Sequence, residues 1–195
     1  MDNIKLLIVD DHPFIRGGLR SALKRQANLI VLGEASNGSE AVKLARDFAP
    51  DLVVMDIYMP IMNGHEATRQ IMRMLPDTNI IILSGDTSGS CVEEALQAGA
   101  RGYLSKSGNV EELIYAISQV MGGRLYLNRQ AGVGILENYR RGLLHGEAPV
   151  RPSHNECDTQ ILRLDAQGRR NKEIAGELAV TTKSVEAILP FDEEV

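Results

Sequence analysis

No long apolar run occurs anywhere among the 195 residues of this chain. Aliphatic stretches such as LLIV at residues 6–9 are far shorter than the roughly 20 residues that a membrane-spanning helix needs. Acidic side chains at positions 2, 10 and 11 interrupt the start of the chain, which is not the pattern of a secretory signal peptide. These absences predict a cytoplasmic protein without a membrane segment.

Cysteine is scarce as well. Cys91 and Cys157 are the only two, and their separation excludes the close pairs that bind metals or exchange disulfides. We therefore expect two unpaired thiols in a reducing compartment.

Positive charge is in short supply at the C-terminal end. Residues 1–145 contain 15 Lys and Arg against 16 Asp and Glu, whereas residues 146–195 contain 6 against 10. Because DNA is a polyanion, this end of the chain is predicted to be a poor partner for it.

What the sequence does have is a repeated alternation. Five short apolar segments, each followed by a segment of helical periodicity, occupy residues 4–121, beginning with KLLIVDD and PFIRGGLRSALKRQ. Strands that are apolar throughout and alternate with helices predict an α/β domain with a five-stranded parallel sheet covered on both faces.

The organisation changes after residue 122. Residues 123–153 are predicted to be a linker that contains one helix at 130–144, since Gly, Pro and Ser follow that helix. Residues 154–195 show two or three short helical segments, which predict a small all-α region.

Polar residues stand where the predicted strands end. Asp10 and Asp11 follow the first strand, Asp56 the third, Ser84 the fourth and Lys106 the fifth. Ligands of such sheets bind beyond the carboxyl ends of the strands, so we expect these side chains to share one pocket. Clustered carboxylates favour Mg²⁺, and a hydroxyl and an ammonium beside it suit a phosphoryl group.

The motifs LLIVDDHPFIRGGL, PDLVVMDIYMPIMNGHEA, IIILSG and AGARGYLSK, which occur in this order, resemble the receiver domain of two-component response regulators. The resemblance covers residues 3–122 and implies a doubly wound, flavodoxin-like fold. It also implies that Asp56 accepts a phosphoryl group from a sensor histidine kinase, a signalling role with only slow self-dephosphorylation. A phosphatase of the haloacid-dehalogenase kind is set aside, because that class has Asp-x-Asp after its first strand.

The same resemblance implies roles for the other pocket residues. Asp11, Asp56 and the main-chain carbonyl of Tyr58 would ligate Mg²⁺ directly, and Asp10 would do so through water. Ser84 and Lys106 would contact the phosphoryl group. Tyr103 matches the aromatic residue whose ring changes rotamer on activation.

The C-terminal sequence motifs ILRL, NKEIAGEL and TTKSV resemble the helix-turn-helix effector domain of NarL/FixJ (LuxR-type) regulators. The resemblance implies DNA contacts from Thr182, Lys183 and Ser184, and it admits a homodimer. The chain departs from the family pattern at Glu186, where a lysine is usual, and at Pro190, which interrupts the helix. The family's fourth helix is absent, so the effector is expected to be incomplete.

Two hypotheses about output remain open. One is a phosphorylation-switched transcriptional regulator that binds DNA. The other is a receiver that acts through protein contacts near Ser84 and Tyr103, with a helix-turn-helix unable to bind DNA.

Overall fold

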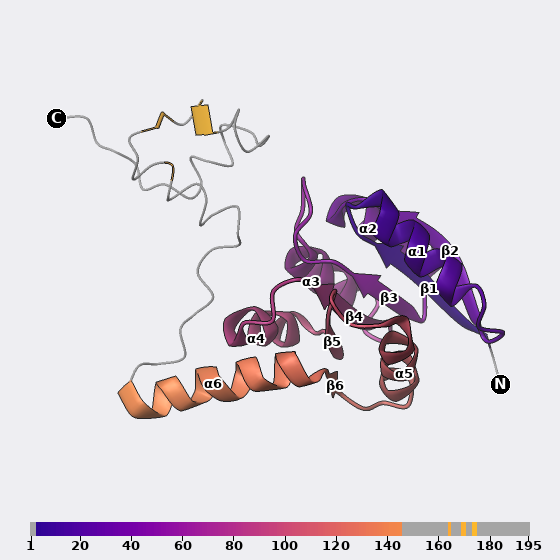
Figure 1. Ribbon diagram of the computed structural model, residues 1–195. Helices are drawn as coiled ribbons and strands as arrows, with labels where there is room; N and C mark the ends of the chain where they lie inside the picture. The colour runs from indigo at the N-terminus through magenta and orange to yellow at the C-terminus, as the bar shows by residue number, and fades with distance from the viewer. Residues whose placement is uncertain (1–2, 146–163, 165–168, 171–172, 175–195) are drawn as a thin grey trace. The chain divides into compact units, whose positions relative to one another are not determined.

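The computed structural model describes residues 3–145, 164, 169–170 and 173–174. The chain divides into two units, Met1–Arg151 and Pro152–Val195, and every element described below belongs to the first. Strands and helices alternate in it, as Figure 1 shows: β1 Ile4–Val9, α1 Pro13–Leu23, β2 Leu29–Ala35, α2 Gly38–Phe48, β3 Leu52–Met55, α3 Gly64–Met74, β4 Asn79–Ser84, α4 Gly89–Ala98, β5 Gly102–Ser105, α5 Val110–Met121, β6 Tyr126–Leu127 and α6 Arg129–His145.

The strands form one parallel sheet in the order β2-β1-β3-β4-β5-β6. The expected parallel α/β fold is confirmed, but the number of strands is not: the sheet has six strands, not five. The sixth strand, Tyr126–Leu127, pairs with Gly102–Tyr103 of β5. Two residues are too few to show a periodicity, so the sequence could not indicate this strand.

Several helices begin where the sequence supplies an asparagine cap. At the start of α2, α3 and α5 the Asn side chain accepts a hydrogen bond from the main-chain nitrogen three residues later, which satisfies an otherwise unpaired donor. The capping residues are Asn37, Asn63 and Asn109. Each cap is followed at that third position by a glutamate, which is favourable in the first helical turn.

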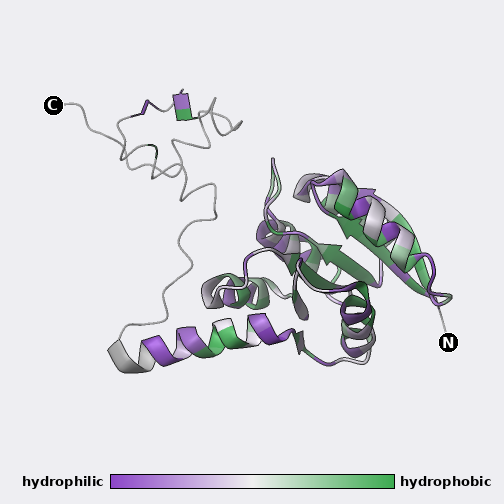
Figure 2. Ribbon diagram, in the orientation of Figure 1, coloured by the Kyte–Doolittle hydropathy of each residue, from purple (hydrophilic) through white to green (hydrophobic). Residues whose placement is uncertain are grey.

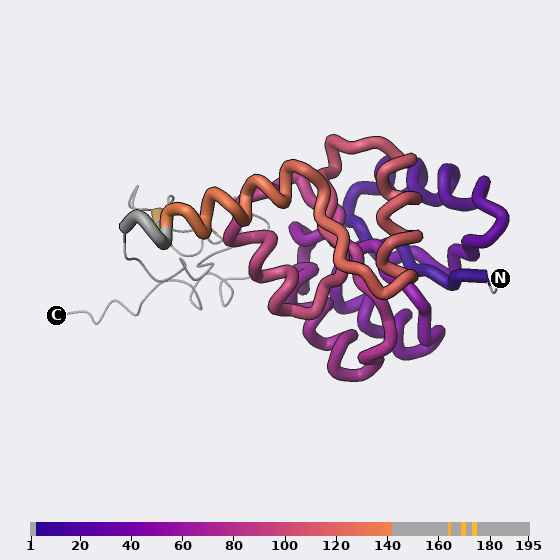
Figure 3. Tube along the Cα trace, turned by 90° about the horizontal axis from the view of Figure 1, so that it is seen from below, coloured from indigo at the N-terminus to yellow at the C-terminus, as the bar shows by residue number. Residues whose placement is uncertain are grey.

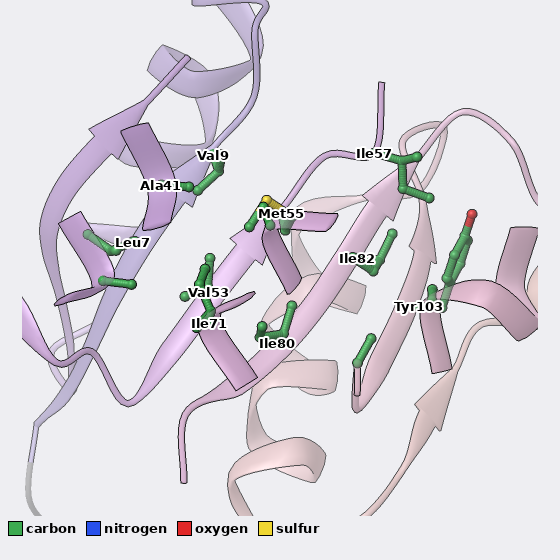
Figure 4. Close-up of a cluster of buried hydrophobic side chains, with 14 of the residues drawn as sticks. Leu7, Val9, Ala41, Val53, Met55, Ile57, Ile71, Ile80, Ile82 and Tyr103 are labelled. Carbon is green, nitrogen blue, oxygen red and sulfur yellow. The ribbon is translucent and has the colours of Figure 1, made fainter. Parts of the chain in front are cut away.

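The two faces of the sheet carry separate hydrophobic cores. Helices α1 and α5 cover one face, where Leu23 and Ile117 pack against strand residues. Helices α2, α3, α4 and α6 cover the other face, part of which is drawn in Figure 4. The inner strands β3, β4 and β5 are strongly apolar, in agreement with the hydrophobic colour of the sheet in Figure 2, because both of their faces are buried, whereas the edge strands β2 and β6 are only partly buried.

Helix α6 covers the region where the sequence predicts a linker helix at 130–144. It lies beside α4 in both Figure 1 and Figure 3, and Ala131 near its start is fully buried in the core of that face. The sheet and its helical cover therefore continue past residue 122. Within the described part of the chain, no helix is both long and apolar enough to cross a bilayer.

Candidate phosphoryl-acceptor site

The carboxyl ends of four neighbouring strands bring the predicted pocket residues together. Asp10 and Asp56 follow β1 and β3, which pair through Val9 and Met55. The main-chain nitrogen of Asp56 donates to the carbonyl of Val9 at 2.8 Å, which fixes the two ends side by side. Ser84 is the last residue of β4, and its carbonyl accepts a hydrogen bond from the main-chain nitrogen of Lys106 at 2.8 Å. Both aspartates and the serine are almost fully buried.

Lys106 joins the two buried carboxylates. Its Nζ lies 2.7 Å from Oδ2 of Asp56 and 2.7 Å from Oδ2 of Asp10. Burial alone would lower the pKa of Lys106, but the two carboxylates outweigh that effect and raise it. The lysine therefore stays charged at neutral pH and bridges the two acids at the strand ends.

Asp56 is held at both oxygens. Oδ1 accepts from the main-chain nitrogen of Ile57 at 2.7 Å, and Oδ2 accepts from Lys106. Burial raises the pKa of Asp56 above its usual range, and the charge of Lys106 offsets only part of this rise. The side chain is positioned and partly desolvated, as an acceptor of a transferred group needs to be.

An acidic cluster stands beside this pair. Ligand atoms of Asp10, Asp11, His12 and Asp56 all lie within 4.8 Å of one another. Two buried oxygens of the cluster, Asp10 Oδ2 and Asp11 Oδ1, accept no well-directed hydrogen bond, although Lys106 and the His12 ring lie near them. Oxygens crowded in this way suit a hard divalent cation, so the residues present fit a metal. His12, whose side chain is 64% exposed, lies at the rim.

The loop after Asp56 approaches its main chain closely. The main-chain nitrogen of Gly64 donates to the carbonyl of Ile57 at 2.8 Å, and a Cβ atom at Gly64 would overlap the carbonyl of Asp56. Only glycine fits at this position. In the same loop Ile61 has a φ of 71°, which is strained for a β-branched residue. The loop is thus bent tightly against the main chain of Asp56 and Ile57.

Tyr103 is fully buried under the loop that follows β4. Its hydroxyl donates to the carbonyl of Asp86 at 2.5 Å and to Sγ of Cys91 at 3.3 Å. Burial raises the pKa of Tyr103 above its usual range and raises the pKa of the Cys91 thiol to about 11. Both groups are therefore neutral hydrogen-bonding partners at physiological pH.

Asp86 was not identified from the sequence, yet it connects three of the predicted site residues. Its carbonyl accepts a hydrogen bond from the Tyr103 hydroxyl, and its Oδ2 accepts one from the Tyr58 hydroxyl at 2.8 Å. Its main-chain nitrogen donates to Ser84 Oγ at 3.2 Å. Burial alone would raise the pKa of Asp86, but hydrogen bonds from Ser88 and Tyr58 outweigh it and hold that pKa low. Its place two residues after Ser84 was the only available signal.

The structure thus brings Asp10, Asp11, Asp56, Ser84 and Lys106 to neighbouring strand ends, and Tyr103 is connected to Ser84 through Asp86. The main chain of Tyr58 lies in the loop directly after Asp56. The predicted DNA contacts Thr182, Lys183 and Ser184 lie outside the described residues.

Comparison with known proteins agrees with this geometry. Residues 6–118 match the family described as the response regulator receiver domain. The transcriptional regulatory protein LiaR of Bacillus subtilis is 39% identical over 93% of this chain and 85% of its own length. Response regulator UvrY of Escherichia coli is 36% identical over 93% of this chain and 83% of its own length.

Among solved structures, a LuxR-family two-component response regulator from Aurantimonas sp. SI85-9A1 is 34% identical. It matches 71% of this chain and 99% of its own, with a TM-score of 0.68. The LuxR-type relatives and the matched receiver sequence lead to one conclusion. This chain belongs to the two-component response regulators, in the NarL/LuxR family.

Proposed function

We propose that Asp56 accepts a phosphoryl group from a phosphohistidine of a sensor histidine kinase. The observation that carries this proposal is the position of Lys106 after β5. Its ammonium lies 2.7 Å from the buried carboxylate of Asp56, which follows β3. As an Asp56 oxygen bonds to phosphorus, the phosphorus–nitrogen bond breaks and the leaving imidazole takes up a proton. Such a transfer depends chiefly on positioning and on neutralising charge.

Mg²⁺ is the proposed cofactor. Asp11, Asp56 and the Tyr58 carbonyl would hold it directly and Asp10 through water, as the two buried oxygens without directed hydrogen bonds suggest. When bound, it would neutralise negative charge on the phosphoryl oxygens.

The protein's own groups do the remaining work. Lys106 would pair with a phosphoryl oxygen, and Ser84 Oγ would donate a hydrogen bond to another. Ser84 Oγ accepts a hydrogen bond from the main-chain nitrogen of Asp86, and the carbonyl of Asp86 accepts one from the Tyr103 hydroxyl. If Ser84 turns to the phosphoryl group, the conformation of the loop after β4 changes, and with it the contact of Tyr103. This is the local event that would switch the domain.

The direct test is phosphorylation by a small phosphodonor with Mg²⁺, followed by intact mass. Asp56→Asn is expected to abolish the acid-labile adduct. Asp47→Asn, which changes an exposed aspartate on α2, is the matched control and should be phosphorylated normally. An Asp56→Asn protein that is modified at the same yield would overturn the assignment.

Regulation of transcription is the proposed output, because LiaR, a transcriptional regulatory protein, aligns with 93% of this chain. The proposed domain order is a receiver at 1–122, a linker at 123–153, of which β6 and α6 pack on the receiver, and a helix-turn-helix region at 154–195. DNA contacts are proposed at Thr182, Lys183 and Ser184. The charge of residues 146–195, with 6 basic and 10 acidic residues, favours a second candidate, output through protein contact. A salt-dependent titration of the full chain with duplex DNA separates the two.

A further inference from the structure

Helix α6 is seated on α4 by an unusually close main-chain contact. A Cβ atom at Gly134 of α6 would overlap the carbonyl oxygen of Thr87, and one at Gly89 of α4 would overlap the carbonyl of Gly134. The two helices can approach this closely only because both positions are glycine. We call the contact between Thr87–Gly89 and Gly134–Asn138 the α4–α6 seam.

The seam adjoins the loop that carries Ser84. Asp86 donates its main-chain nitrogen to Ser84 Oγ, and the next residue, Thr87, makes the close contact with Gly134. Only two residues, Gly85 and Asp86, therefore separate the proposed phosphoryl ligand from the residue that touches α6. A shift of this loop cannot leave the seam unchanged, because a main-chain contact this tight has no slack to absorb it.

A second connection runs through β5 and β6. The main-chain nitrogen of Asn128 donates to the carbonyl of Tyr103 at 3.0 Å, and the Asn128 side chain accepts from Ala131 in the first turn of α6. The strand residue that carries the buried tyrosine ring thus also holds the residue that caps α6. One connection therefore joins α6 to the loop after β4, and the other joins it to β5.

The seam is also built so that it can open. Asn138 is buried in it, yet its side-chain nitrogen has no hydrogen-bond partner, which is a penalty that solvent would remove. Beside the glycine contact a groove of about 490 Å³ remains between α6 and the Thr87–Gly89 segment. The start of the docked helix is packed in the core through Ala131, whereas its contact with Thr87–Gly89 is bordered by this open groove.

We propose that the docking of α6 on α4 is coupled to the phosphorylation of Asp56 through the Ser84–Thr87 loop, and that phosphorylation loosens it. The coupling rests on the proposed function, since Ser84 must engage the phosphoryl group. When it does, Ser84 Oγ gives up its contact with Asp86, the loop moves toward Asp56, and Thr87 withdraws from Gly134. Helix α6 leads directly to residues 146–195, so its release is the output of the switch.

The test compares two glycines of the same helix by hydrogen exchange of the full chain. A Cβ at Gly134 collides with α4, whereas a Cβ at Gly132 meets nothing within 4 Å. Either alanine raises helix propensity to a similar degree, so only the seam distinguishes the two variants. Gly134→Ala is expected to speed exchange in α6 by about tenfold or more, and Gly132→Ala to leave it unchanged or slower.

Each protein is then measured with Mg²⁺ and beryllium fluoride, a stable phosphoryl analogue. Exchange in α6 should become faster in wild type and in Gly132→Ala, with no further rise in Gly134→Ala. By reciprocity, Gly134→Ala should also bind the analogue more tightly. Asn128→Ala, which removes the cap of α6 without entering α4, should loosen the helix too and replaces Gly134→Ala if that variant does not fold.

Equal exchange in the two glycine variants would overturn the proposal. So would α6 amides that are unchanged or slowed by the analogue while amides near Ser84 and Lys106 become protected, because the phosphoryl site would then work without moving α6. If the amides near Ser84 and Lys106 also fail to respond, the proposed function itself fails and the coupling with it.

Discussion

Replacing Lys106 with alanine tests the electrostatic design of the pocket. The lysine lies between the carboxylates of Asp10 and Asp56, each with its Oδ2 at 2.7 Å from Nζ. Without it, two almost fully buried acids face each other with no cation between them. We expect the folded state, and not only signalling, to suffer.

The expected cost follows from the burial of the pair. Removing one partner of a buried ion pair costs about 3–5 kcal/mol, since the other charge stays desolvated. The Lys106 side chain is 18% exposed, so water can enter the space that it leaves, which points to the lower end, about 3 kcal/mol at neutral pH.

The cost should depend on pH and on metal. Because burial raises the folded-state pKa of Asp56, its neutral form is favoured on folding, and the stability this contributes is present at low pH and lost as pH rises. Removing Lys106 enlarges that loss of stability at neutral pH. The free energy of unfolding of the variant should therefore approach that of wild type as the pH falls through the range in which carboxylates become protonated. Millimolar Mg²⁺ should restore part of the stability at neutral pH, since a bound cation replaces the missing charge.

Urea unfolding in the presence of a chelator gives the free energies of unfolding. Lys43→Ala, at an exposed position on α2, is the matched control and should change stability little. In the Lys106→Ala background, Asp10→Asn should recover stability, because it removes the repulsion between the two acids. A loss below about 1 kcal/mol without metal, independent of pH, would show that Lys106 contributes no more than a surface ion pair.

Three further outcomes are expected. Asp11→Asn should abolish Mg²⁺-dependent phosphorylation, measured by intact mass, and Asp10→Asn should weaken it less; full modification of Asp11→Asn would contradict the metal assignment. Burial lowers the folded-state pKa of His65, so its contribution to stability is lost as pH falls below about 6.5, the unfolded value, and His65→Asn should flatten urea-derived stability across that range. For the second candidate, output through protein contact, the phosphorylated chain should bind duplex DNA only weakly and without sequence preference, because residues 146–195 carry 10 acidic and 6 basic residues; a sequence-specific footprint at physiological salt would contradict this candidate and support the transcriptional output.

Much of the fold was predictable because its signals are local. The apolar runs ending at Val9, Met55 and Ser84 predict buried parallel strands, and the helical segments between them predict the covering layers. Strand β6 was missed because its two residues become a strand only through pairing with β5. Helix α6 was predicted as part of a linker, since nothing in its own sequence says that Gly134 meets Thr87.

The sequence by itself determined which chemical groups stand at the ends of the strands, and parallel topology then brings those ends to one edge. Only the tertiary structure decided which atoms meet there. Lys106 reaches Asp56 across 50 residues, and Tyr58 reaches Asp86 across 28. Contacts between residues so far apart depend on strand register and on how helices pack, which no local pattern encodes. For that reason the residues that meet at the candidate site could be named from the sequence, whereas the Asp86 network and the contact of α6 with α4 became visible only in the folded chain.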